Sequence, residues 1–172
     1  YWMNFEIHQL GLCGYVVNTA VEATTLSERV GGCPTCCVCC CCPVAGQLRN
    51  SDQIIRNSIR RCDILVVSVG GNDIALSPSI FTVLAMIFLM ITPWFLLCEW
   101  HPAVLYFIGI FRHATERYIR KLVSGTTPEK IGVCMIYNLD EKNGDSWANL
   151  ALCCLCYCCA PSMLQYRMAL MY

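Results

Sequence analysis

The chain has 172 residues and a mass of 19.3 kDa, which is enough for one domain with a buried core. Twelve Lys and Arg side chains balance twelve Asp and Glu side chains, so no excess positive charge is present to bind a nucleic-acid backbone. Only 14% of the residues are charged and 56% are hydrophobic, which excludes intrinsic disorder. The mean hydropathy of +0.51 requires membrane contact to be considered.

The first predicted element is a short strand at Gly14–Asn18. Two stronger strand candidates follow, at Asp63–Val69 and Ile131–Tyr137, and both are continuous runs of largely β-branched residues. Continuous apolar character predicts burial on both faces, as in a parallel sheet covered by helices.

Helical patterns fill the intervals between these strands. A helix is predicted to begin with Ser51 as its cap and to turn Ile54, Ile55 and Ile59 inward. A longer helix is predicted over 103–123, and a last one over 162–172. The alternation of strands and helices predicts β-α-β units and a three-layer α/β/α architecture, in one domain over 1–172.

An apolar segment at 74–111 interrupts this pattern. It opens with 25 uncharged residues between Asp73 and Glu99, and their most apolar part is Ile80–Ile91. The length permits a membrane span, but Pro78 and Pro93 argue against one. We therefore expect a helix pair that is buried in the fold or lies on a lipid surface. A basic helical face at 112–121 is expected to be solvated, or to meet anionic lipid headgroups.

The sixteen cysteines are distributed unevenly. Seven fall within 33–42 and five within 153–159, many of them adjacent, so they are poor disulfide partners for one another. We expect these runs to be low-complexity insertions in loops, or sites of lipidation. Cys33 and Cys36 have metal-ligand spacing, but no unique second pair accompanies them, so we predict no metal site. The other four cysteines are expected to be small buried side chains: Cys13, Cys62, Cys98 and Cys134.

The beginning of the chain gives an expectation about its origin. The first residue is Tyr1 rather than Met, which suggests a fragment, and Glu6 and His8 lie where a signal peptide would be basic or apolar. The location stays open between an intracellular and a membrane-associated one, with the intracellular one favoured.

The sequence Gly70-Gly71-Asn72-Asp73 follows the Asp63–Val69 strand and is the most informative motif. The glycines allow a sharp turn and close approach to a ligand. An amide at the carboxyl end of a parallel strand can donate a hydrogen bond to an oxyanion. A simple strand-exit turn uses the same residue types.

These residues resemble the third conserved block, Gly-x-Asn-Asp, of the SGNH or GDSL-type hydrolases. The segment Val16–Thr25 is similar to the second block of that family, with Ala23 in place of its glycine. The resemblance implies a flavodoxin-like fold, incomplete at both ends, and a serine esterase or lipase without a cofactor. It implies that Asn72 and the backbone N–H of Ala23 form an oxyanion hole, supported by Gly70, Gly71 and Asp73.

The family's nucleophile and histidine motifs are missing. No Gly-Asp-Ser precedes Asn18, and no Asp-x-x-His contains His8, His101 or His113. Ser146, in a Gly-Asp-Ser that follows the third block, is a weaker candidate nucleophile. We therefore expect these residues alone to be inactive. The substrate would be a small or lipid-like ester, with 74–111 as a lid or acyl-chain wall. The alternative is a non-enzymatic membrane-associated protein, anchored by 74–111 and lipidated cysteines.

Overall fold

The computed structural model describes residues 2–11, 13–21, 24–31, 46–75, 79–134 and 166. In chain order its elements are α1 (Trp2–Gln9), α2 (Leu26–Val30), α3 (Asn50–Ser58), β1 (Ile64–Ser68), α4 (Gly71–Ala75), α5 (Ile80–Ile91), the 3₁₀ turn η1 (Trp94–Leu96), α6 (Pro102–Ile108), the π-helical turn η2 (Gly109–Ala114), α7 (Thr115–Leu122) and β2 (Lys130–Cys134). The helix predicted over 162–172 lies outside the described residues, except for Tyr166.

β1 and β2 form a two-stranded parallel sheet, in which Ile64 pairs with Lys130 and Ser68 with Cys134. Both stronger strand predictions are thereby confirmed, the second as far as Cys134, because residues 135–137 lie outside the described ones. Helices α4 to α7 connect the two strands. The described part of the chain is therefore a mixture of helices and a small parallel sheet, as expected for an α/β protein.

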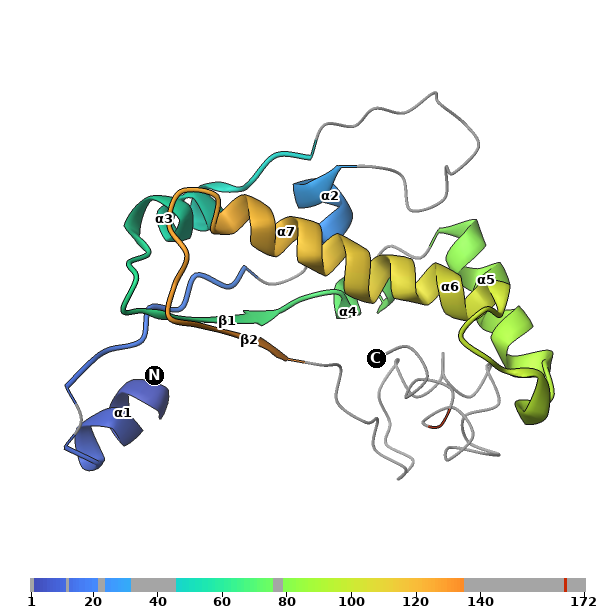
Figure 1. Cartoon of the computed structure of the whole chain (residues 1–172), viewed down its shortest axis with the longest axis horizontal. Coiled ribbons are helices and arrows are strands. Elements are labelled where there is room, and N and C mark those ends of the chain that lie inside the picture. The colour runs from blue at the N-terminus through green and yellow to red at the C-terminus, as the bar shows by residue number, and fades with distance from the viewer. Residues whose placement is uncertain are drawn as a thin grey trace.

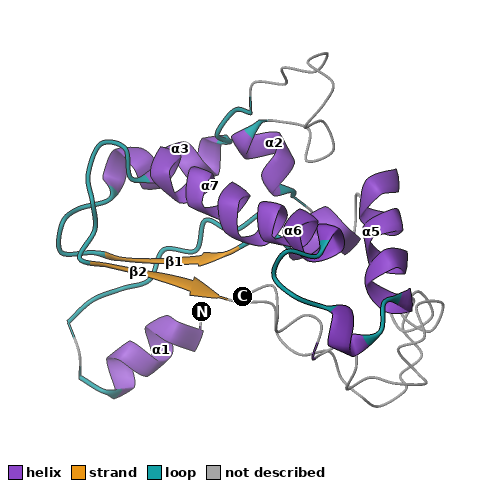
Figure 2. Ribbon diagram, turned by 45° about the vertical axis from the view of Figure 1, so that its right-hand side comes forward, coloured by secondary structure: helices purple, strands orange, loops and turns teal. Residues whose placement is uncertain are grey.

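Helices α2, α3 and α7 lie over one face of this sheet, and α1 stands apart on the other side (Figures 1 and 2). Leu65 and Val67 point to the covered face and are buried. Ile64 and Val66 alternate with them and are 62% and 57% exposed. Burial on both faces is therefore a wrong prediction for the described residues. A run of β-branched residues reflects strand propensity as well as burial.

The strand predicted at Gly14–Asn18 is also absent. These residues form no strand, and the main chain of Val16 instead bonds to the side chain of Asn4 in α1. A short run of β-branched residues forms a strand only where a partner strand is available, and none of the described segments offers one here.

Helix α3 begins two residues earlier than predicted, and Arg49 rather than Ser51 occupies its N-cap position. The backbone N–H of Arg49 donates to the Asp52 carboxylate over 2.9 Å, which fixes the first turn. Ile55 packs against the core as predicted, together with Ile59 just after the helix. Ile54 is exposed, which corrects its predicted inward position.

The four isolated cysteines are exposed free thiols, so the prediction of their burial is wrong. Cys13 and Cys62 lie in a bend and a turn, and Cys98 lies in the loop after η1. Cys134 is the last residue of β2, whose residues are all exposed. Apolar neighbours in the sequence do not bury a residue where the chain itself turns at the surface. The cysteine-rich runs at 33–42 and 153–159 lie outside the described residues.

The helix predicted over 103–123 is confirmed as one continuous stretch, α6–η2–α7 (Figure 1). Its two halves belong to different cores. The "sheet core" consists of Leu26, Leu65, Val67, Tyr118 and Leu122, and so includes α7. The "hairpin core" consists of Leu89, Leu97, Ala103, Val104, Phe107 and Ile110, between α5 and α6.

The apolar segment thus forms the expected helix pair, with α5 packed on α6. None of the helices in the described part of the chain is long and apolar enough to cross a membrane.

Candidate functional site

The turn after β1 is built around Gly70. Its φ of +100° lies in a region that residues with a side chain rarely adopt. A Cβ atom here would come within 3.1 Å of Phe111 Cδ1 in the π-helical turn, and within 3.9 Å of Leu26 Cδ1. Since Phe111 packs on the hairpin core and Leu26 belongs to the sheet core, Gly70 sits where the two cores meet. Gly71 begins α4 and has open space around it.

Asp73 connects this turn to a distant part of the chain. Its two carboxylate oxygens accept hydrogen bonds from the backbone N–H groups of Leu26, over 2.8 Å, and Ser27, over 3.1 Å. These are the first two N–H groups of α2, which a helix cannot satisfy internally. Asp73 therefore caps α2 from 46 and 47 residues away. Each of its oxygens accepts one of these bonds, so the carboxylate holds the turn after β1 against the start of α2.

The predicted oxyanion-hole residues flank this contact. Asn72 lies in α4 directly before Asp73, and the structure describes only its backbone. Ala23 lies outside the described residues, but Thr24 and Thr25, which follow it, are buried. The bond between Leu26 and Asp73 thus brings the chain just after Ala23 to the turn that contains Asn72. Ser146 lies outside the described residues.

His101 is the most buried of the three histidines in the chain, and its contacts are structural. Its Nδ1 accepts a hydrogen bond from the N–H of Ala103 over 3.3 Å and so caps α6. Its Nε2 lies 3.2 Å from the hydroxyl of Thr92, which in turn donates to the carbonyl of Phe88 over 2.7 Å. The ring therefore ties the end of α5 to the start of α6, and both of its nitrogens are engaged.

A buried polar network beside the sheet core was not predicted. Asp52 accepts a hydrogen bond from the Tyr118 hydroxyl over 2.7 Å, and its other oxygen lies 3.1 Å from Arg29 Nε. Asp52 and Arg29 are 2% and 5% exposed. Burial, the hydrogen bond to Asp52 and the charge of Asp52 together raise the pKa of Tyr118, so its phenol stays protonated and donates. In the sequence, Asp52 can be recognised only as an acidic residue three positions after the N-cap of α3, where it would be expected to cap the helix.

The basic face at 112–121 is largely occupied by contacts within the chain. The Lys121 ammonium donates to the carbonyls of Arg29, Val30 and Gly46 over 3.0–3.2 Å. Arg120 pairs with Glu116 over 2.7 Å. These contacts leave less free charge for anionic lipids than the sequence suggests.

No group of three or more His, Cys, Asp or Glu residues in the described ranges could hold a metal ion. Cys33 and Cys36 lie outside these ranges. Comparison of the chain with known protein families, curated proteins and solved structures gives no match. Its function therefore has to be argued from its own residues.

Proposed function

We propose that this chain is part of an SGNH-type ester hydrolase with a three-layer, flavodoxin-like architecture. In this proposal it contributes two donors of the oxyanion hole, the side-chain amide of Asn72 and the backbone N–H of Ala23. The observation that carries the proposal is the cap that Asp73 places on α2. Asp73, in the segment that resembles the third block, bonds to Leu26 and Ser27, which directly follow the segment that resembles the second.

The proposed reaction is acyl transfer. A serine attacks the ester carbonyl, a base takes the serine proton, and negative charge moves onto the carbonyl oxygen. Asn72 and Ala23 donate hydrogen bonds to that oxygen. The carbonyl forms again as the alcohol leaves with the proton that the base returns, and water then attacks the acyl-serine in the same way and releases the acid and the free serine. Gly70 makes the turn, Gly71 has open space beside it for a substrate, and Asp73 holds the two donor segments in place. This chemistry needs no cofactor.

In this proposal, residues within 1–172 supply the oxyanion hole rather than the nucleophile. The family's Gly-Asp-Ser belongs upstream of the second block, and no such motif precedes Asn18. The proposal therefore places the nucleophilic serine and the histidine on chain outside 1–172, and Ser146 is the alternative nucleophile. Residues 74–111 form an acyl-chain wall or lid, which favours lipid-like esters.

The first experiment looks for the nucleophile. The gene product that contains these residues is treated with a fluorophosphonate probe, and the labelled serine is located by mass spectrometry. We expect labelling outside 1–172, and no hydrolysis of p-nitrophenyl esters by the 172-residue chain above a denatured control. Turnover by this chain that Ser146→Ala abolishes would assign the nucleophile to Ser146. Absence of any labelled serine would contradict the hydrolase proposal.

The second candidate function is a non-enzymatic membrane-associated protein. It is favoured by the outward side chains of α5, of which Ile80, Leu84 and Ile91 are each more than half exposed. Carbonate extraction of cell membranes separates the two candidates. A lid or surface element is released by carbonate, whereas an anchored protein is released only by detergent and keeps a protease-protected fragment over 80–98.

A further inference from the structure

Helix α2 has only five residues, and contacts from distant parts of the chain satisfy both of its ends. At its start, Asp73 caps the first two N–H groups. At its end, the Lys121 ammonium of α7 donates to the carbonyls of Arg29 over 3.2 Å and of Val30 over 3.1 Å. These are the last two carbonyls of α2, which the helix itself cannot satisfy. A helix of this length is not stable by itself, so its position depends on such contacts.

The side chain of Arg29 holds the middle of α2 against α3 and α7. It is buried, its Nε lies 3.1 Å from the Asp52 carboxylate, and its guanidinium carbon lies 5.5 Å from the centre of the Tyr118 ring. Tyr118 and Lys121 are three residues apart on α7 and therefore lie on the same side of that helix. One face of α7 thus contacts both a side chain of α2 and its last carbonyls, and the two helices lie side by side (Figures 1 and 2).

Lys121 differs in this respect from the other basic residues of α7. It also donates to the carbonyl of Gly46 over 3.0 Å, so its three bonds match the three N–H donors of an ammonium. Arg117 and Arg120 are exposed, and Arg120 pairs with Glu116 on the same helix. Hydrogen bonds from a charged donor are about twice as strong as neutral ones. Lys121 is therefore the basic residue of α7 that contributes to the position of α2.

We propose that Lys121 is a positioning residue for the oxyanion hole, because it holds α2 and, through α2, the segment that resembles the second block. Only Thr24 and Thr25 separate Ala23 from α2, and both are buried. The Thr24 hydroxyl also donates to the carbonyl of Val21 over 3.0 Å. A displacement of α2 therefore meets little free chain before it reaches Ala23. The inference deepens the proposed function and rests on it for the role in catalysis.

Hydrogen exchange, read by mass spectrometry at single residues, tests the contact without an assay of activity. In the full-length gene product, Lys121→Met keeps the aliphatic stem of the side chain and removes the ammonium. The amides of Leu26 and Ser27 should exchange about tenfold faster or more, although they lie at the other end of α2. The matched control Arg120→Met removes a charge from the exposed side of the same helix and should change their exchange less than twofold. Unchanged exchange at Leu26 and Ser27, or equal changes in the two variants, would overturn the proposal.

Kinetics on a p-nitrophenyl ester test the role in catalysis. Lys121→Met should lower kcat about tenfold with KM nearly unchanged, at a temperature well below its thermal midpoint, because a displaced donor acts mainly on the transition state. A contact that only stabilises the fold would lower the midpoint and leave kcat unchanged. Lys121→Gln keeps an N–H donor without the charge, should lose less of kcat, and replaces Lys121→Met if that variant does not fold.

An active parent protein whose kcat neither variant changes would overturn the positioning role. A folded parent protein without esterase activity would instead contradict the proposed function, and the exchange of Leu26 and Ser27 would still decide whether Lys121 holds α2.

Discussion

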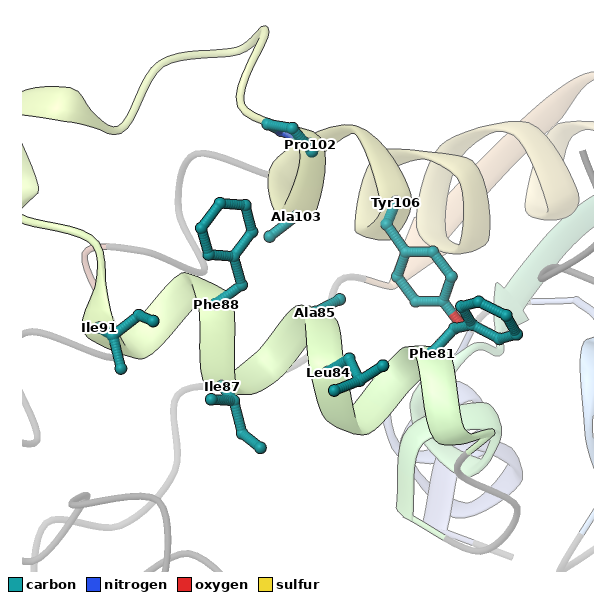
Figure 3. Close-up of a pocket in the computed structure, with 9 residues that line it drawn as sticks. All are labelled: Phe81, Leu84, Ala85, Ile87, Phe88, Ile91, Pro102, Ala103 and Tyr106. Atoms are coloured by element: carbon teal, nitrogen blue, oxygen red, sulfur yellow. The ribbon is translucent and has the colours of Figure 1, made fainter.

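The sheet core and the hairpin core differ in how they are closed. Around the sheet core, polar contacts join segments that are distant in the sequence, including the hydrogen bonds between Asp52 and Tyr118 and between Asp73 and Leu26. The polar contacts of Tyr106 with Ser79 and Thr82, and of His101 with Thr92, join the neighbouring elements α5 and α6 around the hairpin core, and the outer side of α5 is exposed. The sheet region is therefore held by contacts between segments distant in the sequence, whereas the hairpin leaves an apolar helix face exposed (Figure 3).

The continuous helix α6–η2–α7 shows the same contrast within one element. Its first half is apolar all round: Ala103, Val104 and Phe107 are buried in the hairpin core, whereas Leu105 is exposed. Its second half is amphipathic, with Tyr118 and Leu122 turned to the sheet core and Arg117 and Arg120 turned outward. The π-helical turn between them lies against Gly70, where the two cores meet.

The largest expected effect on stability is in the sheet core. Asp52→Ala removes the partner of Arg29 and Tyr118 and leaves a buried guanidinium without its carboxylate, so the free energy of unfolding should fall by about 3–5 kcal/mol. Urea denaturation measures this change. The control is Glu28→Ala, which removes the exposed pair with Arg49 and should cost less than about 1 kcal/mol. Equal losses of unfolding free energy in the two variants would mean that the buried network does not stabilise this core more than an exposed ion pair does.

A smaller effect is expected where the cores meet. Gly70→Ala forces a side chain into a φ of +100° and towards Phe111, and should lower the free energy of unfolding by about 1–3 kcal/mol. Gly71→Ala is the matched control, since its surroundings are open and it lies in a helix, where Ala is favoured. Thermal unfolding of both variants measures the difference. A Gly70→Ala protein as stable as Gly71→Ala would show that the turn is not tightly packed.

The smallest effect is expected at the solvent-exposed side of α7. The hydrogen bond and charge of Arg120 lower the pKa of Glu116 in the folded protein. A lowered folded-state pKa stabilises the protein above the unfolded-state pKa, and this contribution disappears as the pH falls through the folded-state pKa. Glu116→Gln should therefore be slightly less stable than the parent at pH 7 and equal to it at pH 2, with a smaller difference at high salt. A difference that persists at pH 2 would point to packing rather than charge.

Much of the fold could be predicted from the sequence, because strong local patterns encode it. The β-branched run at 64–68 and the helical spacing of Phe107, Phe111 and Tyr118 specify their elements directly. The covered face of the sheet could not be predicted in this way, because it depends on which side the helices pack. The buried Asp52 was missed because a charged residue in a sequence is expected at the surface.

The candidate site was predictable only in part. The Gly70 turn follows from two glycines after a strand, whereas the cap that Asp73 places on α2 joins residues 47 positions apart and has no local signal. The hydroxyl cluster of Ser79, Thr82 and Tyr106 was missed for the same reason, since Tyr106 is 24 and 27 residues from its partners.

Asn72→Ala in the full-length gene product tests the central claim most directly, with kcat, KM and the thermal midpoint measured together. An oxyanion donor acts on charge that develops only in the transition state, so its loss should lower kcat more than it changes KM. We predict a loss in kcat of about 10²–10³-fold, corresponding to roughly 3–4 kcal/mol of barrier, with little change in the thermal midpoint. A loss of about tenfold or less in a folded protein would show that Asn72 only shapes the turn, and would contradict the oxyanion-hole proposal.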